Sequence, residues 1–344
     1  MLKRVHIQTD KLAAAFDPGN LNLILLPTEK CNFRCTYCYE DFKTGRMRPA
    51  VIAAVKNFIQ RRAPDLHSLE IGWFGGEPLI AKPVIYEISQ HILDVIEQSS
   101  HSFAYQANIT TNGYYLDEPT VQQLVALGIN FFQISLDGYQ EMHDRTRVKA
   151  DGSGSFSTIW SNLLAIRESN LSLTIMLRVH FSPENFQELD RLIEAINHEF
   201  ADDRRFTVYF KSIERLGGPH DSTIRRFSYR LTTEVKRVLE SKLKYEMQIY
   251  RNPEEQPYIC YASKPNSFIF RANGDVAKCT VALSDERNRI GELQQDGTIH
   301  IDQPKLRPWI RGFASLNEQE LACPYRGMNG TVKGGEDRED VLPG

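Results

Sequence analysis

The chain has 344 residues, of which 41% are hydrophobic and 25% charged, and its formal net charge is −3. This length allows one large domain plus a smaller one, and the weak net charge argues against nucleic-acid binding as the main function. No apolar stretch approaches the roughly 20 residues that span a bilayer, and Asp10, Lys11 and Asp17 interrupt any signal-peptide core. Six cysteines without an export signal favour metal ligation over disulfides, so we expect a cytoplasmic protein without membrane or nucleic-acid partners.

Short apolar runs alternate with helical stripes as far as residue 211. The expected strands are Leu21–Leu26, Leu69–Phe74, Phe103–Thr111, Ile129–Leu136, Leu171–Val179 and Phe206–Lys211. The expected helices carry apolar stripes within residues 51–59, 85–96, 121–127, 156–166 and 186–196. Six such βα units imply an α/β protein with a parallel sheet, although periodicity alone does not distinguish a barrel from an open sheet.

The pattern changes after the sixth expected strand. A breaker-rich stretch at 216–220 precedes an expected connecting helix, Leu231–Ile249. A β-hairpin is then expected from Ser267–Phe270 and Val276–Cys279 around a turn at Asn273-Gly274. We therefore predict these divisions: an N-terminal segment (1–20), a main domain (21–215), a linker with the connecting helix (216–251), a small α+β domain (252–331) and a disordered tail (332–344).

Cys31, Cys35 and Cys38 form a C-x3-C-x2-C triplet directly after the first expected strand. Three thiolates in one loop can hold a four-iron cube and leave one iron open to another ligand, whereas structural zinc would want a fourth Cys or His nearby. The spacing, with an aromatic residue before the third cysteine, resembles the radical S-adenosylmethionine (SAM) enzymes. The resemblance implies a partial (βα)6 TIM-type barrel, a [4Fe-4S] cluster on these cysteines, and SAM bound at the open iron and cleaved to a 5′-deoxyadenosyl radical.

Active sites of parallel βα proteins lie at the carboxyl ends of the strands, and polar residues gather there in this sequence. Gly75-Gly76-Glu77-Pro78 matches the GGEP element of the family, which implies that Gly75, Gly76 and Glu77 hold the SAM ammonium; a plain turn is the alternative. Tyr37 occupies the aromatic position beside the adenine. Further SAM contacts are expected from short polar residues at the ends of the third and fourth strands, with helix caps or turns as the alternative. These residues are Thr111, Asn112, Ser135 and Asp137.

Two further groups of charged residues need explanation. Arg178 lies inside the fifth strand among aliphatic residues and should have an anionic partner. By resemblance this partner is the SAM carboxylate, and an internal ion pair with Asp137 or Glu77 is the alternative. The segment His143-Asp144-Arg145-Thr146-Arg147 follows the fourth strand. It could meet substrate, or it could be a charged surface with local salt bridges.

A second cysteine set, Cys260, Cys279 and Cys323, distinguishes this chain from most of the superfamily. The C-x13-G-x4-C pattern resembles the start of the SPASM and Twitch extensions, in which a hairpin turning at Gly274 ligates an auxiliary [4Fe-4S] cluster. With three cysteines after residue 250, the chain resembles a shortened, Twitch-like version with one such cluster. A second cysteine is usual where Arg326 stands, so the fourth iron ligand is undefined. Structural or zinc-binding cysteines are the alternative.

The resemblance extends over roughly residues 20–330 and is strongest to maturases of ribosomally made peptides, including cyclophane-forming members that crosslink side chains. It implies a precursor-peptide substrate and an electron donor such as flavodoxin or ferredoxin. About twenty residues precede the first strand, so leader recognition is expected from the barrel, the extension or a separate leader-binding protein. Thr280 stands where sulfatase maturases typically carry an Asp base. The alternatives are an anaerobic sulfatase maturase, a radical SAM dehydrogenase or cofactor-synthesis enzyme acting on a small molecule, and a non-catalytic zinc or redox-sensing protein.

Overall fold

The computed structural model describes residues 9–99, 101–250 and 258–328. These residues form two compact units. The first comprises the described parts of 1–30, 42–107 and 252–333, and the second those of 31–41 and 108–251. The first cysteine triplet therefore belongs to the second unit, whereas the later cysteines belong to the first. No helix in the described part of the chain is long and apolar enough to cross a membrane.

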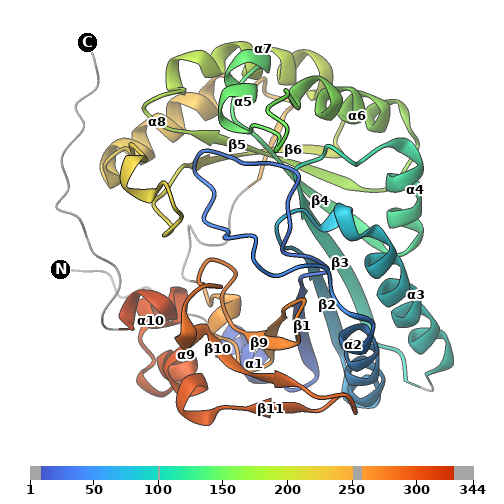
Figure 1. The fold of residues 1–344 in the computed structure, drawn as a ribbon. Helices are drawn as coiled ribbons and strands as arrows, with labels where there is room; N and C mark the ends of the chain where they lie inside the picture. Colours follow the sequence, from blue (N-terminus) through green and yellow to red (C-terminus); the bar gives the residue numbers. More distant parts are fainter. Residues whose placement is uncertain (1–8, 100, 251–257, 329–344) are drawn as a thin grey trace. The chain divides into compact units, whose positions relative to one another are not determined.

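The first unit is built on a mixed sheet (Figure 1). Strand β1 (Asn20–Leu25) pairs in parallel with β2 (Ser68–Trp73) on one side and with β8 (Ser267–Phe270) on the other. From β8 the order continues through three short antiparallel strands. They are β9 (Asp275–Ala277), β10 (Arg289–Leu293) and β11 (Ile299–Ile301). The C-terminal extension thus has antiparallel strands, as predicted, and its first strand continues the sheet of β1.

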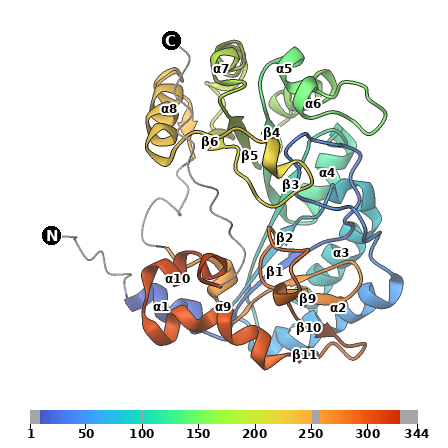
Figure 2. The same cartoon turned by 60° about the vertical axis from the view of Figure 1, so that its left-hand side comes forward.

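Helices bury both ends of this unit. Helix α2 (Pro49–Arg62) begins with a proline in its first turn, and α3 (Lys82–Gln98) lies beside it and buries its apolar stripe. Helix α1 (Thr9–Phe16) lies beside α9 (Gln303–Ser315) and α10 (Glu318–Ala322) in Figure 2. A small core unites this second group. Its buried members are Ala15, Ile259, Phe313 and Leu321.

The second unit contains the parallel strands β4 (Ile129–Leu136), β5 (Thr174–Phe181) and β6 (Phe206–Ser212), followed by the short β7 (Gln248–Ile249). Strand β3 (Ala104–Thr111) crosses the boundary between the units. The helices of this unit run between these strands and cover one face of its sheet (Figure 1). They are α4 (Glu118–Ala126), α5 (Gln140–Thr146), α6 (Phe156–Glu168), α7 (Leu189–Phe200) and α8 (Tyr229–Ser241).

The two faces of the β4–β6 sheet differ in chemistry. Ile175, Leu177 and Val179 alternate along β5 and are fully buried on the helix-covered face. The other face carries polar groups, because Ser135, Arg178 and Tyr209 stand in register across the three strands. We call this the polar face. Its residues are Gln133, Ser135, Arg178, His180, Tyr209 and Lys211.

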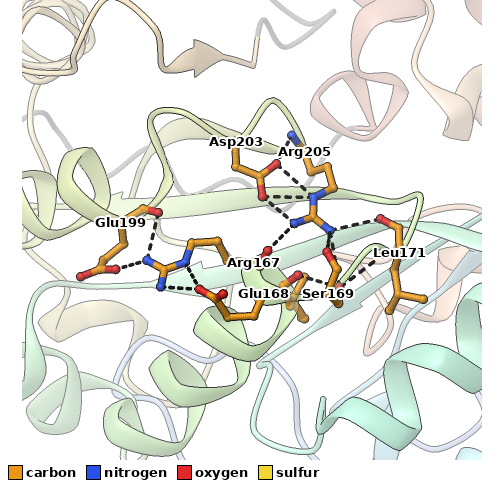
Figure 3. A network of polar contacts seen from close by, with 8 residues as sticks. Arg167, Glu168, Ser169, Leu171, Glu199, Asp203 and Arg205 are labelled. Carbon is orange, nitrogen blue, oxygen red and sulfur yellow. Dashed lines mark hydrogen bonds and ion pairs between the residues drawn. The ribbon is translucent and has the colours of Figure 1, made fainter.

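A network of charged groups lies at the amino end of β5 and holds the chain that leads into this strand (Figure 3). The Arg205 guanidinium forms an ion pair with Asp203 (2.7 Å) and donates to the carbonyl oxygens of Arg167 (2.7 Å), Ser169 (2.7 Å) and Leu171 (3.2 Å). Arg205 thereby satisfies three carbonyls at and just beyond the C-terminal end of α6. This network explains why β5 begins at Thr174 and not at Leu171, since the carbonyl of Leu171 is already bonded to Arg205.

Most predicted strands and helices of the main domain are present with ends shifted by one to three residues. The predicted connecting helix, Leu231–Ile249, is wrong at its C-terminal end. Helix α8 ends at Ser241, and Gln248–Ile249 joins the sheet as β7. The Asn197 side chain explains this end, because it donates to the carbonyl of Lys242 (2.9 Å) and accepts from the amide of Lys244 (2.8 Å). The predicted disordered tail lies outside the described residues, and the domain boundaries remain predictions.

Candidate active site

The cysteine loop has the local geometry of a ligand-binding turn. The amide of Cys38 donates to the carbonyl of Cys35 (3.1 Å), and the amide of Phe33 points at the Cys31 sulfur (3.3 Å). Burial, together with the neighbouring Cys35, raises the pKa of the Cys38 thiol to about 12, although a backbone hydrogen bond from Glu40 opposes this rise. The loop thus presents partly buried thiols close enough to interact, with an amide directed at sulfur, which suits a metal–sulfur cluster that accepts hydrogen bonds.

Tyr37 and Asp137 join the cysteine loop to the carboxyl ends of β4 and β5. The Tyr37 hydroxyl lies 2.9 Å from Oδ1 of Asp137, and Nδ1 of His180 lies 3.0 Å from the same oxygen. The Thr146 hydroxyl donates to Oδ2 (2.8 Å), and Arg147 lies 3.9 Å from Oδ1. Although burial acts to raise it, the hydrogen bond from His180 and the charge of Arg147 hold the pKa of Asp137 well below its usual range. Asp137 is therefore an ionised, fully buried centre of a hydrogen-bond network.

The other predicted SAM contacts of this unit lie in two places. Ser135 and Arg178 lie side by side on the polar face, and Nε of Arg178 is buried without a hydrogen-bond acceptor among the described residues. Asn112 donates to Oδ1 of Asn32 in the cysteine loop (2.9 Å). The hydroxyl of Thr111 accepts from the amide of Gly113 (3.1 Å), which is the local turn considered as the alternative. Arg178 forms no ion pair with Asp137, whose oxygens bind other groups in the described chain.

The Gly75-Gly76-Glu77 element belongs to the first unit. Gly75 has φ +128°, and a side-chain carbon there would lie 2.1 Å from the carbonyl oxygen of Thr28. At Gly76 it would lie 2.5 Å from the carbonyl oxygen of Lys30. The two glycines therefore let the backbone after β2 close against the chain just before Cys31. One oxygen of Glu77 accepts from the amide of Leu79 (2.9 Å), so this carboxylate also caps the short helix Pro78–Ala81.

The predicted auxiliary cysteines converge from three segments. The amide of Cys260 donates to the carbonyl of Leu321 (2.9 Å), which places Cys260 near the segment that holds Cys323. Burial and then the neighbouring thiols of Cys260 and Cys323 raise the pKa of Cys279 to about 11, although amides of Val281 and Ala282 oppose this. Gly274 has φ +95° and makes the predicted hairpin turn. These thiols therefore form one group, and the donor set fits an iron–sulfur cluster.

Two buried charges accompany this second group. The Lys278 side chain is 1% exposed, and its ammonium donates to the carbonyls of Lys264 (2.6 Å) and Ser267 (2.6 Å). Burial lowers the pKa of Lys278 to about 7, and the Cys260 thiol opposes this shift. Glu29, 2% exposed, forms a two-pronged ion pair with Arg271 (3.1 and 2.6 Å). This pair ties the end of β1 to the hairpin that carries Cys279.

Residues 143–146 belong to helix α5 and Arg147 directly follows it, and the charged-surface interpretation holds for part of this segment. Arg145 lies on the surface and pairs with Glu188 (3.0 Å), as a charged surface predicts. Asp144 instead caps α6 by accepting from the amides of Ser155 (2.8 Å) and Phe156 (2.9 Å). His143 and Arg147 are buried, at 0% and 7% exposure. Their burial is a correction to the surface interpretation, and it arises because α5 packs against the cysteine loop and α6.

All six cysteines are free of disulfides. No three His, Cys, Asp or Glu side chains of the described residues surround a common point as the ligands of a single metal ion would. A four-iron cube attaches each cysteine to a different iron, so its ligands need no such convergence. A hollow of 440 Å³ in the first unit contains none of the predicted site residues. It lies at the amino ends of β1 and β2, beside Asn20 and Ser68.

Comparison with known proteins identifies the chemistry of the triplet. The model of the radical SAM superfamily matches residues 25–196, which include the cysteine loop and strands β2 to β5. The chain belongs to the radical SAM superfamily. Membership implies a [4Fe-4S] cluster, and the three thiols of the loop are its natural donor set. The match thus confirms the family that we inferred for this radical SAM enzyme from the C-x3-C-x2-C spacing.

Several curated proteins are similar in sequence. A PqqA peptide cyclase of Granulibacter bethesdensis is 26% identical over 176 residues, 51% of this chain and 43% of that protein. A cysteine-type anaerobic sulfatase-maturating enzyme of Clostridium novyi is 24% identical over 213 residues, 59% of this chain and 54% of its own length. A PqqA peptide cyclase of Xanthomonas axonopodis pv. citri is 26% identical over 320 residues, 90% of this chain and 81% of that protein. The matched region is thus about half of the length of the first two relatives.

Solved structures show the fold. The structure of anSMEcpe with bound AdoMet has a TM-score of 0.63 at 15% identity, covering 86% of this chain and 82% of the other. Streptococcus suis SuiB bound to the precursor peptide SuiA has a TM-score of 0.56 at 14% identity, covering 86% and 65%. These likenesses confirm the predicted fold class, a partial barrel of the radical SAM type with a small C-terminal extension.

Sequence reasoning missed His180 and Lys278, and it named Arg147 only within a charged segment without placing it at the cysteine loop. His180 follows Arg178 by two positions and so shares its face of β5, a signal that strand alternation could have revealed. Arg147 and Lys278 carried no such signal. Long cations are usually exposed, and only the packing of distant segments around them makes them buried.

Proposed function

We propose that this radical SAM enzyme oxidatively modifies a ribosomally made precursor peptide, most simply by crosslinking two of its side chains. The observation that carries the proposal is the second group of thiols, Cys260, Cys279 and Cys323, of which Cys279 lies on a hairpin that continues the sheet of β1. The similarity to PqqA peptide cyclases over 90% of the chain supports a peptide as substrate. The likeness to SuiB supports a fold that can accept one.

The first cysteine group would hold the cluster at which SAM binds. Bound there, the cluster and SAM supply a carbon-centred radical that removes a hydrogen atom from the substrate. The polar face would position SAM, with Arg178 toward its carboxylate and Tyr37 beside the adenine. Further polar contacts to SAM would come from Ser135, Asn112 and Thr111. The ammonium of SAM would bind at Gly75, Gly76 and Glu77. Asp137, whose oxygens already accept from protein groups, would act by holding Tyr37 in place.

Forming one bond between two side chains removes two hydrogens from the peptide. One leaves as a hydrogen atom, and the other leaves as a proton together with an electron that needs an acceptor. The Cys260 group would hold that acceptor, a second [4Fe-4S] cluster, in a Twitch-like extension. The buried Lys278 beside Cys279 supplies positive charge near the added electron. Flavodoxin or ferredoxin would deliver the starting electron, which fits disulfide-free cysteines in a reducing cytoplasm.

We expect co-expression with a cognate precursor peptide to yield a product that is two hydrogens lighter, with tandem mass spectrometry locating a bond between two side chains. Peptide expressed alone is the control and should keep its full mass. Oxidation confined to one cysteine side chain would instead support a sulfatase-maturase activity, which the Clostridium novyi relative favours and Thr280 disfavours. An unmodified cognate peptide, with active SAM cleavage, would contradict the peptide assignment and favour a small-molecule substrate.

We expect Arg178→Ala to weaken SAM binding about ten- to a hundred-fold, because one charge-assisted contact contributes about 1.5–3 kcal/mol. The iron spectrum should not change, since Arg178 holds no iron. Calorimetric titration of the reconstituted enzyme measures the affinity. Arg230→Ala is the matched control, as this arginine is 91% exposed and pairs with Glu234 on α8. An unchanged affinity of Arg178→Ala for SAM would show that the role of Arg178 is purely structural.

A further inference from the structure

The segment after helix α5 pairs with the cysteine loop as a short antiparallel strand. Phe33 and Lys149 form the central bridge. Three backbone hydrogen bonds flank it: Arg34 N to Val148 O (2.6 Å), Thr36 N to Thr146 O (2.9 Å) and Ala150 N to Asn32 O (2.8 Å). We call Thr146–Ala150 the latch. The Asn32 carbonyl and the amides of Arg34 and Thr36 are thereby tied to it, so the latch constrains the loop that carries the first three cysteines.

The latch places one arginine under this loop. Arg147 is 7% exposed, and its Nη1 donates to the Tyr37 hydroxyl at 2.8 Å. Its guanidinium lies 5.8 Å from the centre of the Phe33 ring. Tyr37 and Phe33 flank Cys35 in the sequence, so the guanidinium contacts the loop on both sides of the middle cysteine. The Ser155 hydroxyl, itself buried, donates to the Arg147 carbonyl (3.2 Å) and fixes the backbone of the latch.

The charge of Arg147 is incompletely compensated by protein groups. A buried guanidinium remains protonated and needs negative partners. Asp137 is 3.9 Å away and also accepts from Tyr37, His180 and Thr146. Nε of Arg147 is buried and has no hydrogen-bond acceptor among the described residues. The contacts of the guanidinium with Tyr37 and Phe33 place it against the part of the loop that carries Cys35. The missing negative charge is therefore expected from the thiolate side of the loop.

We propose that Arg147 is a positioning residue of the first cluster, which shapes the cysteine loop through the latch and stabilises the added negative charge of the reduced cluster. The inference rests on the proposed ligation by Cys31, Cys35 and Cys38. A reduced cluster carries one more negative charge than an oxidised one, so a fixed cation nearby favours the reduced form. Arg147 therefore raises the reduction potential, which makes the cluster accessible to a biological electron donor.

The experiment compares four reconstituted full-length proteins: wild type, Arg147→Gln, Arg147→Lys and Arg145→Gln. Arg145 is the matched control because it lies two residues away and pairs with Glu188 on the surface. An EPR-monitored redox titration gives the potential of the first cluster, and hydrogen–deuterium exchange follows the amides of Arg34 and Thr36. We expect Arg147→Gln to shift the potential to a more negative value and to accelerate exchange. Arg147→Lys should keep a potential near wild type but still exchange faster, and Arg145→Gln should match wild type in both.

A folded Arg147→Gln protein with the wild-type potential would overturn the inference. If Arg147→Gln does not fold, Arg147→Lys decides, because a lysine keeps the charge but cannot reproduce the planar contacts of the guanidinium. Faster exchange at Arg34 and Thr36 in that variant then supports the positioning role, and wild-type exchange refutes it. Failure of the proposed ligation looks different, since wild-type protein itself would then bind no iron–sulfur cluster on the first three cysteines.

Discussion

Replacing Cys31, Cys35 and Cys38 together with alanine should abolish the formation of 5′-deoxyadenosine from SAM. The three thiols lie in one loop whose backbone is held by the latch and by the bond from Cys38 N to Cys35 O, none of which needs sulfur. The variant should therefore fold but hold no cluster where SAM binds. Iron should fall from about eight to about four atoms per chain, because each [4Fe-4S] cluster carries four.

Chromatographic assay of 5′-deoxyadenosine after anaerobic reconstitution and reduction tests this first expectation. The matched control replaces Cys260, Cys279 and Cys323 with alanine, which should also remove about four irons but leave SAM cleavage in place. Undiminished 5′-deoxyadenosine from the Cys31, Cys35 and Cys38 variant would refute the assignment of the first cluster. An iron content near four in wild type, unchanged in the control, would eliminate the auxiliary cluster.

Cys279→Ala should uncouple SAM cleavage from product formation. Hydrogen abstraction needs the first cluster alone, whereas completing a crosslink needs an acceptor for the remaining electron. The backbone at Cys279 is held without its sulfur, because the Asn288 side chain accepts from the Cys279 amide (2.9 Å) and donates to its carbonyl (2.8 Å). The variant should therefore keep the hairpin, make 5′-deoxyadenosine at a wild-type rate, and lose the product that is two hydrogens lighter.

Mass spectrometry of the peptide and assay of 5′-deoxyadenosine in the same reaction measure this coupling, with circular dichroism to verify the fold. Thr280→Val is the matched control, because it alters the next residue and removes only a hydroxyl that contacts Tyr261 (2.9 Å). It should retain crosslinking. Complete crosslinking by folded Cys279→Ala protein would show that the extension shapes the pocket and does not accept an electron.

Local sequence determined the recognisable chemistry of this protein. The spacing of Cys31, Cys35 and Cys38, the Gly75-Gly76 pair and the turn at Gly274 depend on a few neighbouring residues, since thiolate reach and positive φ are local properties. The strands of the main domain followed from short apolar runs for the same reason. Where predicted boundaries were wrong, as at β5 and α8, side chains of Arg205 and Asn197 from distant segments had bonded the local carbonyls.

Tertiary structure alone decided which charged residues are buried at the site. Arg145 lies in the last turn of α5 and Arg147 directly follows that helix, yet Arg147 is buried beneath the cysteine loop and Arg145 is exposed with Glu188. Their local sequences do not distinguish them, because the difference arises from the latch pairing with residues more than a hundred positions earlier. Likewise, Lys278 is buried because the carbonyls of Lys264 and Ser267 surround its ammonium once the hairpin closes. The sequence by itself therefore predicts the ligands of this enzyme, whereas folding decides the charges that surround them.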